Sequence, residues 1–108
     1  MRTYKANVFR ALSHPTRIAI LEVLRDKELP ARTIQEMLGL EQANLSQHLA
    51  ILRSYQIVVN RKDGNQVFYS IRNPVLVQVL DIMRQYIQSS LADAVQMLGE
   101  AELEASPR

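Results

Sequence analysis

Short amide and hydroxyl side chains between residues 42 and 47 carry the clearest chemistry in this sequence. Together with one alanine they form the set Gln42, Ala43, Asn44, Ser46 and Gln47, and Ser54 follows further along. Glutamine and asparagine can form paired hydrogen bonds with adenine, serine can bond several bases, and an alanine methyl can contact the methyl of thymine. A helix face that only contacts water more often carries lysine and glutamate. The pattern therefore favours contact with base edges over a plain polar surface.

Two short helices are expected to position these side chains. Their apolar positions repeat with helical spacing and are Ile34, Leu38, Leu45, Leu49 and Leu52. Gly39 interrupts the pattern and indicates a tight turn between the two helices. Two amphipathic helices joined in this way predict a helix-turn-helix, whose second helix normally lies in the major groove of DNA.

The sequence period changes after residue 58 from helical to alternating. Val67, Tyr69 and Ile71 recur at every second position, which predicts a strand with one buried face. Asp63-Gly64 indicates a hairpin turn before this strand, because glycine adopts the positive φ that such turns need. The tip of the hairpin carries Arg61, Lys62, Asn65 and Gln66. Directly after a helix-turn-helix, such a hairpin is predicted to be a wing that reaches phosphates or the minor groove, although any exposed hairpin tip is polar.

The remaining chain is expected to be helical, with proline and glycine at the breaks. Helices are predicted over residues 2–12, 16–25 and 31–38, and Pro15 and Pro30 suit first helical turns. A long helix is predicted from the Asn73-Pro74 cap to Gly99. Its principal apolar strip is Leu76, Leu80, Met83, Ile87, Leu91, Ala94 and Leu98. A second strip lies beside it, so one strip can cover the domain while the other meets the same helix of a second copy in a two-fold dimer.

The composition indicates one globular domain with an uneven distribution of charge. The chain has 108 residues, of which 47% are hydrophobic and 22% are charged. Residues 1–72 carry eleven basic and six acidic groups, whereas residues 93–108 carry one basic and four acidic groups. A basic body with an acidic end suits a protein that offers one face to nucleic acid. We expect a domain over residues 1–99 and an acidic, disordered tail over residues 100–108.

Several functional classes are disfavoured by what the sequence lacks. The chain has no cysteine, which removes disulfides, thiol catalysis and thiolate metal ligands. No apolar run is long enough to span a membrane, and the N-terminus lacks the apolar core of a signal peptide, so a cytoplasmic protein is expected. Without a glycine-rich phosphate loop or paired carboxylates on a rigid element, we expect neither an enzyme nor a cofactor.

Three segments of the chain resemble the ArsR/SmtB-type winged helix-turn-helix repressors of bacteria. They are LSHPTRIAILEVL at residues 12–24, NLSQHLAILR at residues 44–53 and RKDGNQVFYSI at residues 61–71. The resemblance covers about residues 5–98. It implies a mainly helical α+β fold of about five helices with a small β-hairpin, and a homodimer that contacts its partner through the first and last helices. It also implies binding to an imperfect inverted repeat and repression of a nearby operon until a cue releases the protein.

The resemblance also assigns residues to the two interfaces. At the DNA it implies Gln42, Ala43, Ser46, Gln47 and His48, with Arg61 and Lys62 in the wing. The dimer contacts would include Tyr4, Val8, Leu80, Met83, Ile87, Leu91, Ala94 and Leu98. For His48 two interpretations stay open: a phosphate contact, as in the family, or a histidine packed at the edge of the buried stripe.

The chain departs from the family's pattern where other members bind metals. Metal-sensing members carry two cysteines after the second helix, whereas this chain has Pro30 and Arg32 in that stretch. The positions that match a second metal site, at the last helix, are Asn73, Val75, Tyr86 and Ser89. None of these is a good ligand for a transition metal, so we expect no metal site. Glu41 stands where the family more often has serine, and its charge would repel a phosphate at this helix end.

The sequence thus predicts a sequence-specific transcriptional regulator that binds double-stranded DNA, as a homodimeric repressor released by a cue other than a metal. A winged helix that binds proteins and a nonspecific architectural DNA binder are the alternatives, although the latter is usually more basic than net +2. The operator and the regulated genes are not identified by the sequence. Whether the effector is a small molecule, a partner protein or absent also stays open.

Overall fold

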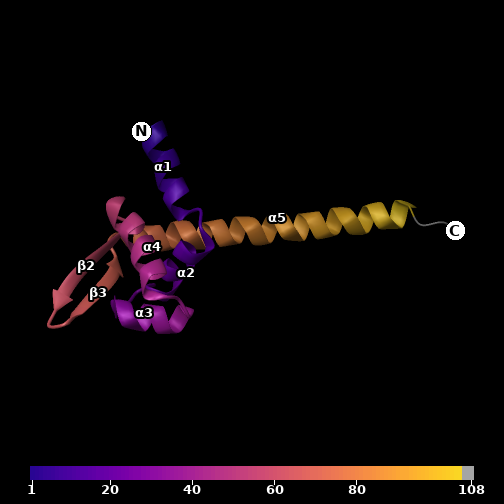
Figure 1. Cartoon of the computed structure of the whole chain (residues 1–108). Helices are drawn as coiled ribbons and strands as arrows, with labels where there is room; N and C mark the ends of the chain where they lie inside the picture. Colours follow the sequence, from indigo (N-terminus) through magenta and orange to yellow (C-terminus); the bar gives the residue numbers. More distant parts are fainter. Residues whose placement is uncertain (106–108) are drawn as a thin grey trace. The chain divides into compact units, whose positions relative to one another are not determined.

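The computed structural model describes residues 1–105, with side chains to residue 102 (Figure 1). Its elements are α1 (Arg2–Leu12), α2 (Pro15–Val23), β1 (Leu29–Pro30), α3 (Ala31–Leu38), α4 (Gln42–Ser54), β2 (Val58–Asp63), β3 (Gln66–Ile71) and α5 (Val75–Ala105). Residues 1–76 form one compact unit, and α5 from Val77 onward is a second unit. The predicted fold class, mainly helical with a β-hairpin and five helices, is confirmed for the described residues.

Local sequence determines where the helices of the compact unit begin and end. Pro15 lies in the first turn of α2 as predicted, and the Nδ1 atom of His14 accepts a hydrogen bond of 3.1 Å from the backbone N–H of Thr16. Gly39 ends α3 with a φ of 64°, a left-handed conformation that glycine adopts without strain. The turn of the predicted helix-turn-helix is therefore confirmed at this residue.

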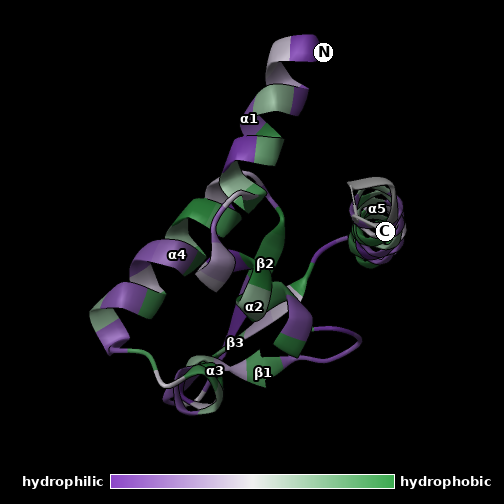
Figure 2. Ribbon diagram, turned by 90° about the vertical axis from the view of Figure 1, so that its right-hand side faces the viewer, coloured by the Kyte–Doolittle hydropathy of each residue, from purple (hydrophilic) through white to green (hydrophobic). Residues whose placement is uncertain are grey.

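The core of the compact unit lies between α2, α3, α4 and the start of β2. Its fully buried large side chains are Ile20, Leu21, Leu24, Ile34, Leu52 and Val58. Figure 2 shows apolar segments of α2, α4 and β2 in the middle of this unit. Burial of each such side chain contributes roughly 1.5–3 kcal/mol. The predicted apolar stripe of α4 is thus the face that attaches this helix to the rest of the unit.

The sheet has three antiparallel strands in the order β1-β3-β2. β1 was not predicted, and it places Pro30 in an extended conformation before α3 instead of in the first helical turn. The hairpin turn is Gly64-Asn65, one residue later than predicted, because Asp63 pairs with Gln66. Residues 67–71 of β3 are half-buried throughout, so the expected alternation is absent. The central strand has a neighbour on each side, and residues on both of its faces are partly covered.

α5 begins as predicted, but it does not end at Gly99. The Oδ1 atom of Asn73 accepts a hydrogen bond of 3.0 Å from the backbone N–H of Val75, which confirms the predicted cap. The helix continues through Gly99 to Ala105, so the predicted stop was wrong. Glycine lowers helix stability by only ~1 kcal/mol, and the alanine and glutamates that follow are good helix formers. Residues 106–108 of the predicted tail lie outside the described residues. No described helix is long and apolar enough to cross a membrane.

Candidate nucleic-acid interface

The outward face of α4 presents all five predicted base-contacting residues. Gln42, Ala43, Asn44, Ser46 and Gln47 are exposed. Leu45 and Leu49, which lie on the other side of the helix, are each only 2% exposed. Because these leucines fix the rotation of α4 about its axis, the amide and hydroxyl side chains are held toward solvent. Glu41 precedes them as the helix cap, and its side chain makes no capping hydrogen bond.

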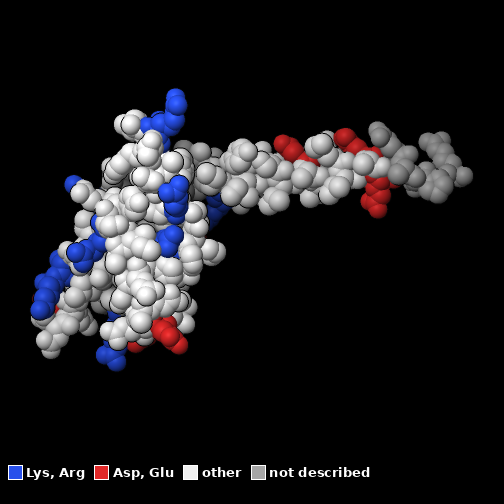
Figure 3. Space-filling view, turned by 45° about the horizontal axis from the view of Figure 1, so that its top comes forward, with Lys and Arg blue, Asp and Glu red and all other residues white. Residues whose placement is uncertain are grey.

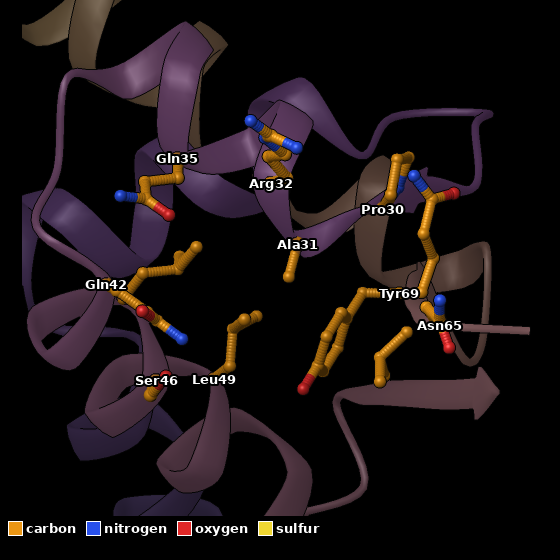
Figure 4. Close-up of a pocket in the computed structure, with 12 residues that line it drawn as sticks. Pro30, Ala31, Arg32, Gln35, Gln42, Ser46, Leu49, Asn65 and Tyr69 are labelled. Atoms are coloured by element: carbon orange, nitrogen blue, oxygen red, sulfur yellow. The ribbon is translucent and has the colours of Figure 1, made fainter.

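A groove of about 530 Å³ lies between the start of α3, which contributes Arg32, the start of α4 and the hairpin (Figure 4). Gln42 and Ser46 line one side of it, and Asn65 and Gln66 line the other side. Leu49 and Val67 are among its apolar lining residues. The structure therefore brings together four predicted residues from two elements that are separated in sequence. Their side chains can donate and accept hydrogen bonds along one continuous surface.

The two cations of the hairpin lie on opposite faces of it. Residues that pair directly across two antiparallel strands share a face, and successive residues alternate between faces. Lys62 pairs with Val67, which lines the groove. Arg61 pairs with Phe68 and therefore lies on the face opposite to that of Lys62. The sequence alone does not distinguish these two cations, whereas the strand register places them on different faces.

Arg61 is engaged by two carboxylates of the protein itself. Its Nε atom donates hydrogen bonds to Oε1 and Oε2 of Glu28 at 2.8 and 2.9 Å, and its Nη2 lies 2.6 Å from Oε1. Its Nη1 lies 3.5 Å from Oδ2 of Asp63. The hydrogen bond with Glu28 is the main cause that raises the pKa of Arg61, and the same bond lowers the pKa of Glu28. Glu28 was missed by the sequence analysis because the unpredicted strand β1 brings it to this position.

His48 is packed inside the compact unit. It is 9% exposed, and its ring centroid lies 4.4 Å from that of His14. Nη1 of Arg17 lies 3.3 Å from Nδ1 of His48, and the same guanidinium donates hydrogen bonds to the carbonyls of Arg10 and Ala11 at the end of α1. Burial, followed by the positive charges of His14 and Arg17, lowers the pKa of His48. This environment favours the packed interpretation, and the predicted phosphate contact stays a prediction.

Charge is distributed differently over the two units. Residues 1–76 carry eleven basic and six acidic groups, and after Arg84 the charged residues of α5 up to Glu102 are all acidic. On the face shown in Figure 3, many basic and a few acidic groups lie on the compact unit, and acidic groups lie toward the C-terminal end of α5. Among the described residues, no group of three or more His, Cys, Asp or Glu side chains could hold a metal ion.

The residues predicted for dimer contacts are mostly exposed in the single chain. On α5 the exposed fractions are 44% for Met83, 47% for Ile87, 60% for Leu91 and 70% for Leu98. Tyr4 of α1 is 58% exposed, whereas Val8 and Leu80 are half-buried. The second strip of α5 is also exposed at Val79, Ile82, Tyr86 and Val95. Large apolar side chains in such numbers on one helix are typical of an interaction surface.

Known proteins are similar to most of this chain. A family model described as a helix-turn-helix domain matches residues 12–60. The HTH-type transcriptional regulator Rv0081 of Mycobacterium tuberculosis is 41% identical over 98 residues, which are 87% of this chain and 83% of that protein. The crystal structure of Rv0081 matches with a TM-score of 0.82 at 38% identity, and the match covers 87% of this chain and 95% of that chain.

Two further proteins extend the comparison to a named repressor and to a solution structure. The transcriptional repressor SdpR of Bacillus subtilis is 32% identical over 81 residues, which are 75% of this chain and 90% of that protein. A homodimeric winged helix-turn-helix DNA-binding domain of Mycobacterium bovis, Mb0332, has a TM-score of 0.75 at 24% identity. That match covers 82% of each chain. At this identity the likeness concerns the fold, which is a winged helix-turn-helix.

Proposed function

We propose that this chain, which belongs to the ArsR-type winged helix-turn-helix transcriptional regulators, is a homodimeric repressor that binds an inverted-repeat operator in the cytoplasm. The observation that carries the proposal is the exposed face of α4, with its amide and hydroxyl side chains fixed outward by buried leucines. Similarity to SdpR, a transcriptional repressor, supports repression as the direction of control.

In this proposal α4 supplies base contacts and the hairpin supplies contacts to the backbone. Gln42, Asn44 and Gln47 present amides for adenine, and Ser46 and Ala43 can contact other base edges. Lys62, on the groove face of the hairpin, contacts a phosphate, and Asn65 and Gln66 hydrogen-bond to the backbone or the minor groove. Phosphate contacts then supply most of the affinity, while the uncharged face of α4 supplies sequence preference.

The dimer is proposed from the exposed apolar residues of α5 and α1. A two-fold dimer presents two copies of α4, and such proteins bind half-sites in inverted orientation about one helical turn apart. The strip that includes Met83, Ile87, Leu91 and Leu98 is the proposed seam of α5, with Tyr4 and Val8 contributing from α1. This arrangement would cover apolar side chains that are exposed in the single chain.

The releasing cue is proposed to be something other than a metal ion. Pro30 and Arg32 occupy the stretch where metal-sensing members of the family carry cysteines. A small organic molecule or a partner protein is the proposed effector.

The test is selection of genomic fragments of the source organism on the purified protein at near-physiological salt, followed by sequencing. We expect enrichment of one or a few inverted repeats close to promoters. A double variant, Gln42→Ala with Gln47→Ala, is the matched control. It should still bind DNA, but the inverted repeats should no longer be enriched. A flat profile for the unchanged protein would contradict the proposal and favour a winged helix that binds other proteins.

A further inference from the structure

We propose that Glu28 is a positioning residue that withholds Arg61 from DNA and thereby sets the affinity of the hairpin for the phosphate backbone. The inference rests on the proposed DNA-binding function and deepens it. It assigns different roles to two neighbouring cations: Lys62 contacts DNA, whereas Arg61 is held by the protein.

The geometry at Arg61 is that of an occupied phosphate-binding group. Both carboxylate oxygens of Glu28 face its guanidinium, at 2.6 to 2.9 Å, and Asp63 lies at 3.5 Å from the remaining nitrogen. The guanidinium fork binds carboxylates and phosphates in the same bidentate manner. A DNA phosphate would therefore have to displace Glu28 before it could bind Arg61 in this way.

The ring of Phe68 holds the guanidinium in place from a third direction. The central carbon of the Arg61 guanidinium lies 4.6 Å from the ring centroid of Phe68, the cross-strand partner of Arg61. This cation–π contact adds to the two carboxylate contacts on the same face of the hairpin. Lys62 lies on the other face, and no hydrogen bond or ion pair is found for it among the described residues. The two cations therefore differ in how freely they can meet a phosphate.

Chain topology explains how Glu28 reaches the hairpin. Glu28 directly precedes β1, which pairs with the central strand β3 at Leu29↔Tyr69 and Pro30↔Phe68. This pairing brings a carboxylate from the α2–α3 connection next to a strand that starts 30 residues later in the chain. The side chain of Glu28 is 37% exposed and that of Arg61 is 52% exposed. Because exposed ion pairs contribute little to stability, removing this one should leave the fold intact.

The experiment compares Glu28→Gln with the unchanged protein on an operator duplex and on a shuffled duplex over a range of salt concentrations. Glutamine keeps the shape of the side chain but removes its charge, so a phosphate competes for Arg61 with a neutral amide in place of the Glu28 carboxylate. We expect tighter binding to both duplexes and a salt slope that is steeper by about 0.9, as one added phosphate contact requires. The gain should consequently be about threefold larger at 50 mM than at 200 mM salt.

Two variants separate this effect from a change of net charge or of folding. Glu22→Gln removes an exposed carboxylate of α2 in the same compact unit, away from Arg61 and from the groove, and it should leave the salt slope unchanged. Arg61→Ala combined with Glu28→Gln should return the slope to that of the unchanged protein. Thermal unfolding followed by circular dichroism checks that each variant is folded.

Each remaining outcome has a definite meaning. An unchanged slope for Glu28→Gln, an equal gain for Glu22→Gln, or weaker binding by the folded Glu28→Gln protein would overturn the role of Glu28 and leave the proposed repressor function standing. Failure of the unchanged protein to bind either duplex would overturn the proposed function and this inference together.

Discussion

At the scale of single residues, the exposed face of α4 combines base-contacting chemistry with an absence of positive charge. Its five polar or small side chains follow Glu41, the residue at the helix start, and the first lysine or arginine of the helix is Arg53 near its far end. Such a face can distinguish bases but gains little from the negative charge of DNA. Specificity and affinity should therefore depend on different residues, and this separation can be measured.

Gln47→Ala should weaken operator binding by ~1–3 kcal/mol and change binding to random DNA little, because it removes an amide that is proposed to contact base edges and removes no charge. Fluorescence anisotropy titrations on both duplexes measure the two losses. Gln78→Ala, which changes an exposed glutamine of α5, is the matched control and should change neither. Equal weakening on both duplexes by Gln47→Ala would count against base contact.

Lys62→Ala and Arg61→Ala should differ although the residues are neighbours. Lys62 lies on the groove face of the hairpin, so its loss should weaken binding to all DNA and reduce the salt slope by about 0.9. Arg61 is paired with Glu28, so its loss alone should leave the slope unchanged. Anisotropy titrations over a range of salt concentrations measure the salt slope of each variant. Equal slopes for the two variants would contradict the different roles proposed for Lys62 and Arg61.

At the scale of elements, a histidine pair and one arginine join α1, α2 and α4. The imidazole of His14 caps α2 and contacts the ring of His48 in α4, and Arg17 of α2 hydrogen-bonds to the last carbonyls of α1. Protonation of His48 would place a positive charge beside that of Arg17 and against the ring of His14 at a buried position. The contacts of His14, Arg17 and His48 that join α1, α2 and α4 are therefore expected to weaken in acid.

The stability of the fold should fall as the pH is lowered below about 6.5, the usual pKa of histidine. The pKa of His48 is lower in the folded protein, chiefly through burial, so the unfolded chain takes up a proton first. The loss should continue until the pH reaches the lowered folded pKa. Thermal unfolding at pH 7.5 and 5.0 measures this loss of stability. The decrease in stability between the two pH values should be smaller for His48→Gln than for the unchanged protein. An equal drop in both proteins would assign the acid sensitivity to other groups.

Most element ends at a proline, asparagine or glycine could be predicted from the sequence, with Pro30 and Gly99 as exceptions. The observed ends of α1, start of α2 and bounds of α3 agree with the predicted ones, because Pro15 and Gly39 have strong local backbone preferences. β1 has only two residues, too few for any periodicity, so the position of Glu28 beside Arg61 could not be anticipated. Gly64 predicted the hairpin but suited two adjacent turns, and only strand pairing decided between them.

The site was predictable where it depends on one helix and not where it depends on pairing between elements. The outward face of α4 follows directly from the spacing of its leucines. Arg61 and Lys62 lie on different faces because of the strand register. The sequence could not show this register, because the residues of β3 do not alternate between buried and exposed. The continuation of α5 through Gly99 reflects the weak helix-breaking effect of one glycine among good helix formers.

At the scale of the whole molecule, the two units differ in charge and in the apolar surface they expose. The compact unit has a net positive charge, whereas α5 is acidic beyond Arg84 and exposes large apolar side chains on more than one side. Acidic groups on α5 would be repelled by DNA, which assigns DNA contact to the compact unit and leaves α5 for association with protein. A helix this long and apolar is expected to be covered in solution, and a second copy supplies a surface of matching chemistry.

Leu91→Asp should dissociate the proposed dimer, because it places a charge within an apolar strip that would be buried between two copies of α5. Sedimentation velocity should show a shift from dimer to monomer at micromolar protein concentration. Operator affinity should fall by more than tenfold, because each half-site would then be bound by an independent monomer. Gln85→Glu adds the same charge to α5 away from the Leu91 strip and should leave the protein dimeric. If Leu91→Asp sediments as the unchanged protein does, the strip is not the dimer seam, and the second strip of Ile82 and Tyr86 becomes the next surface to test.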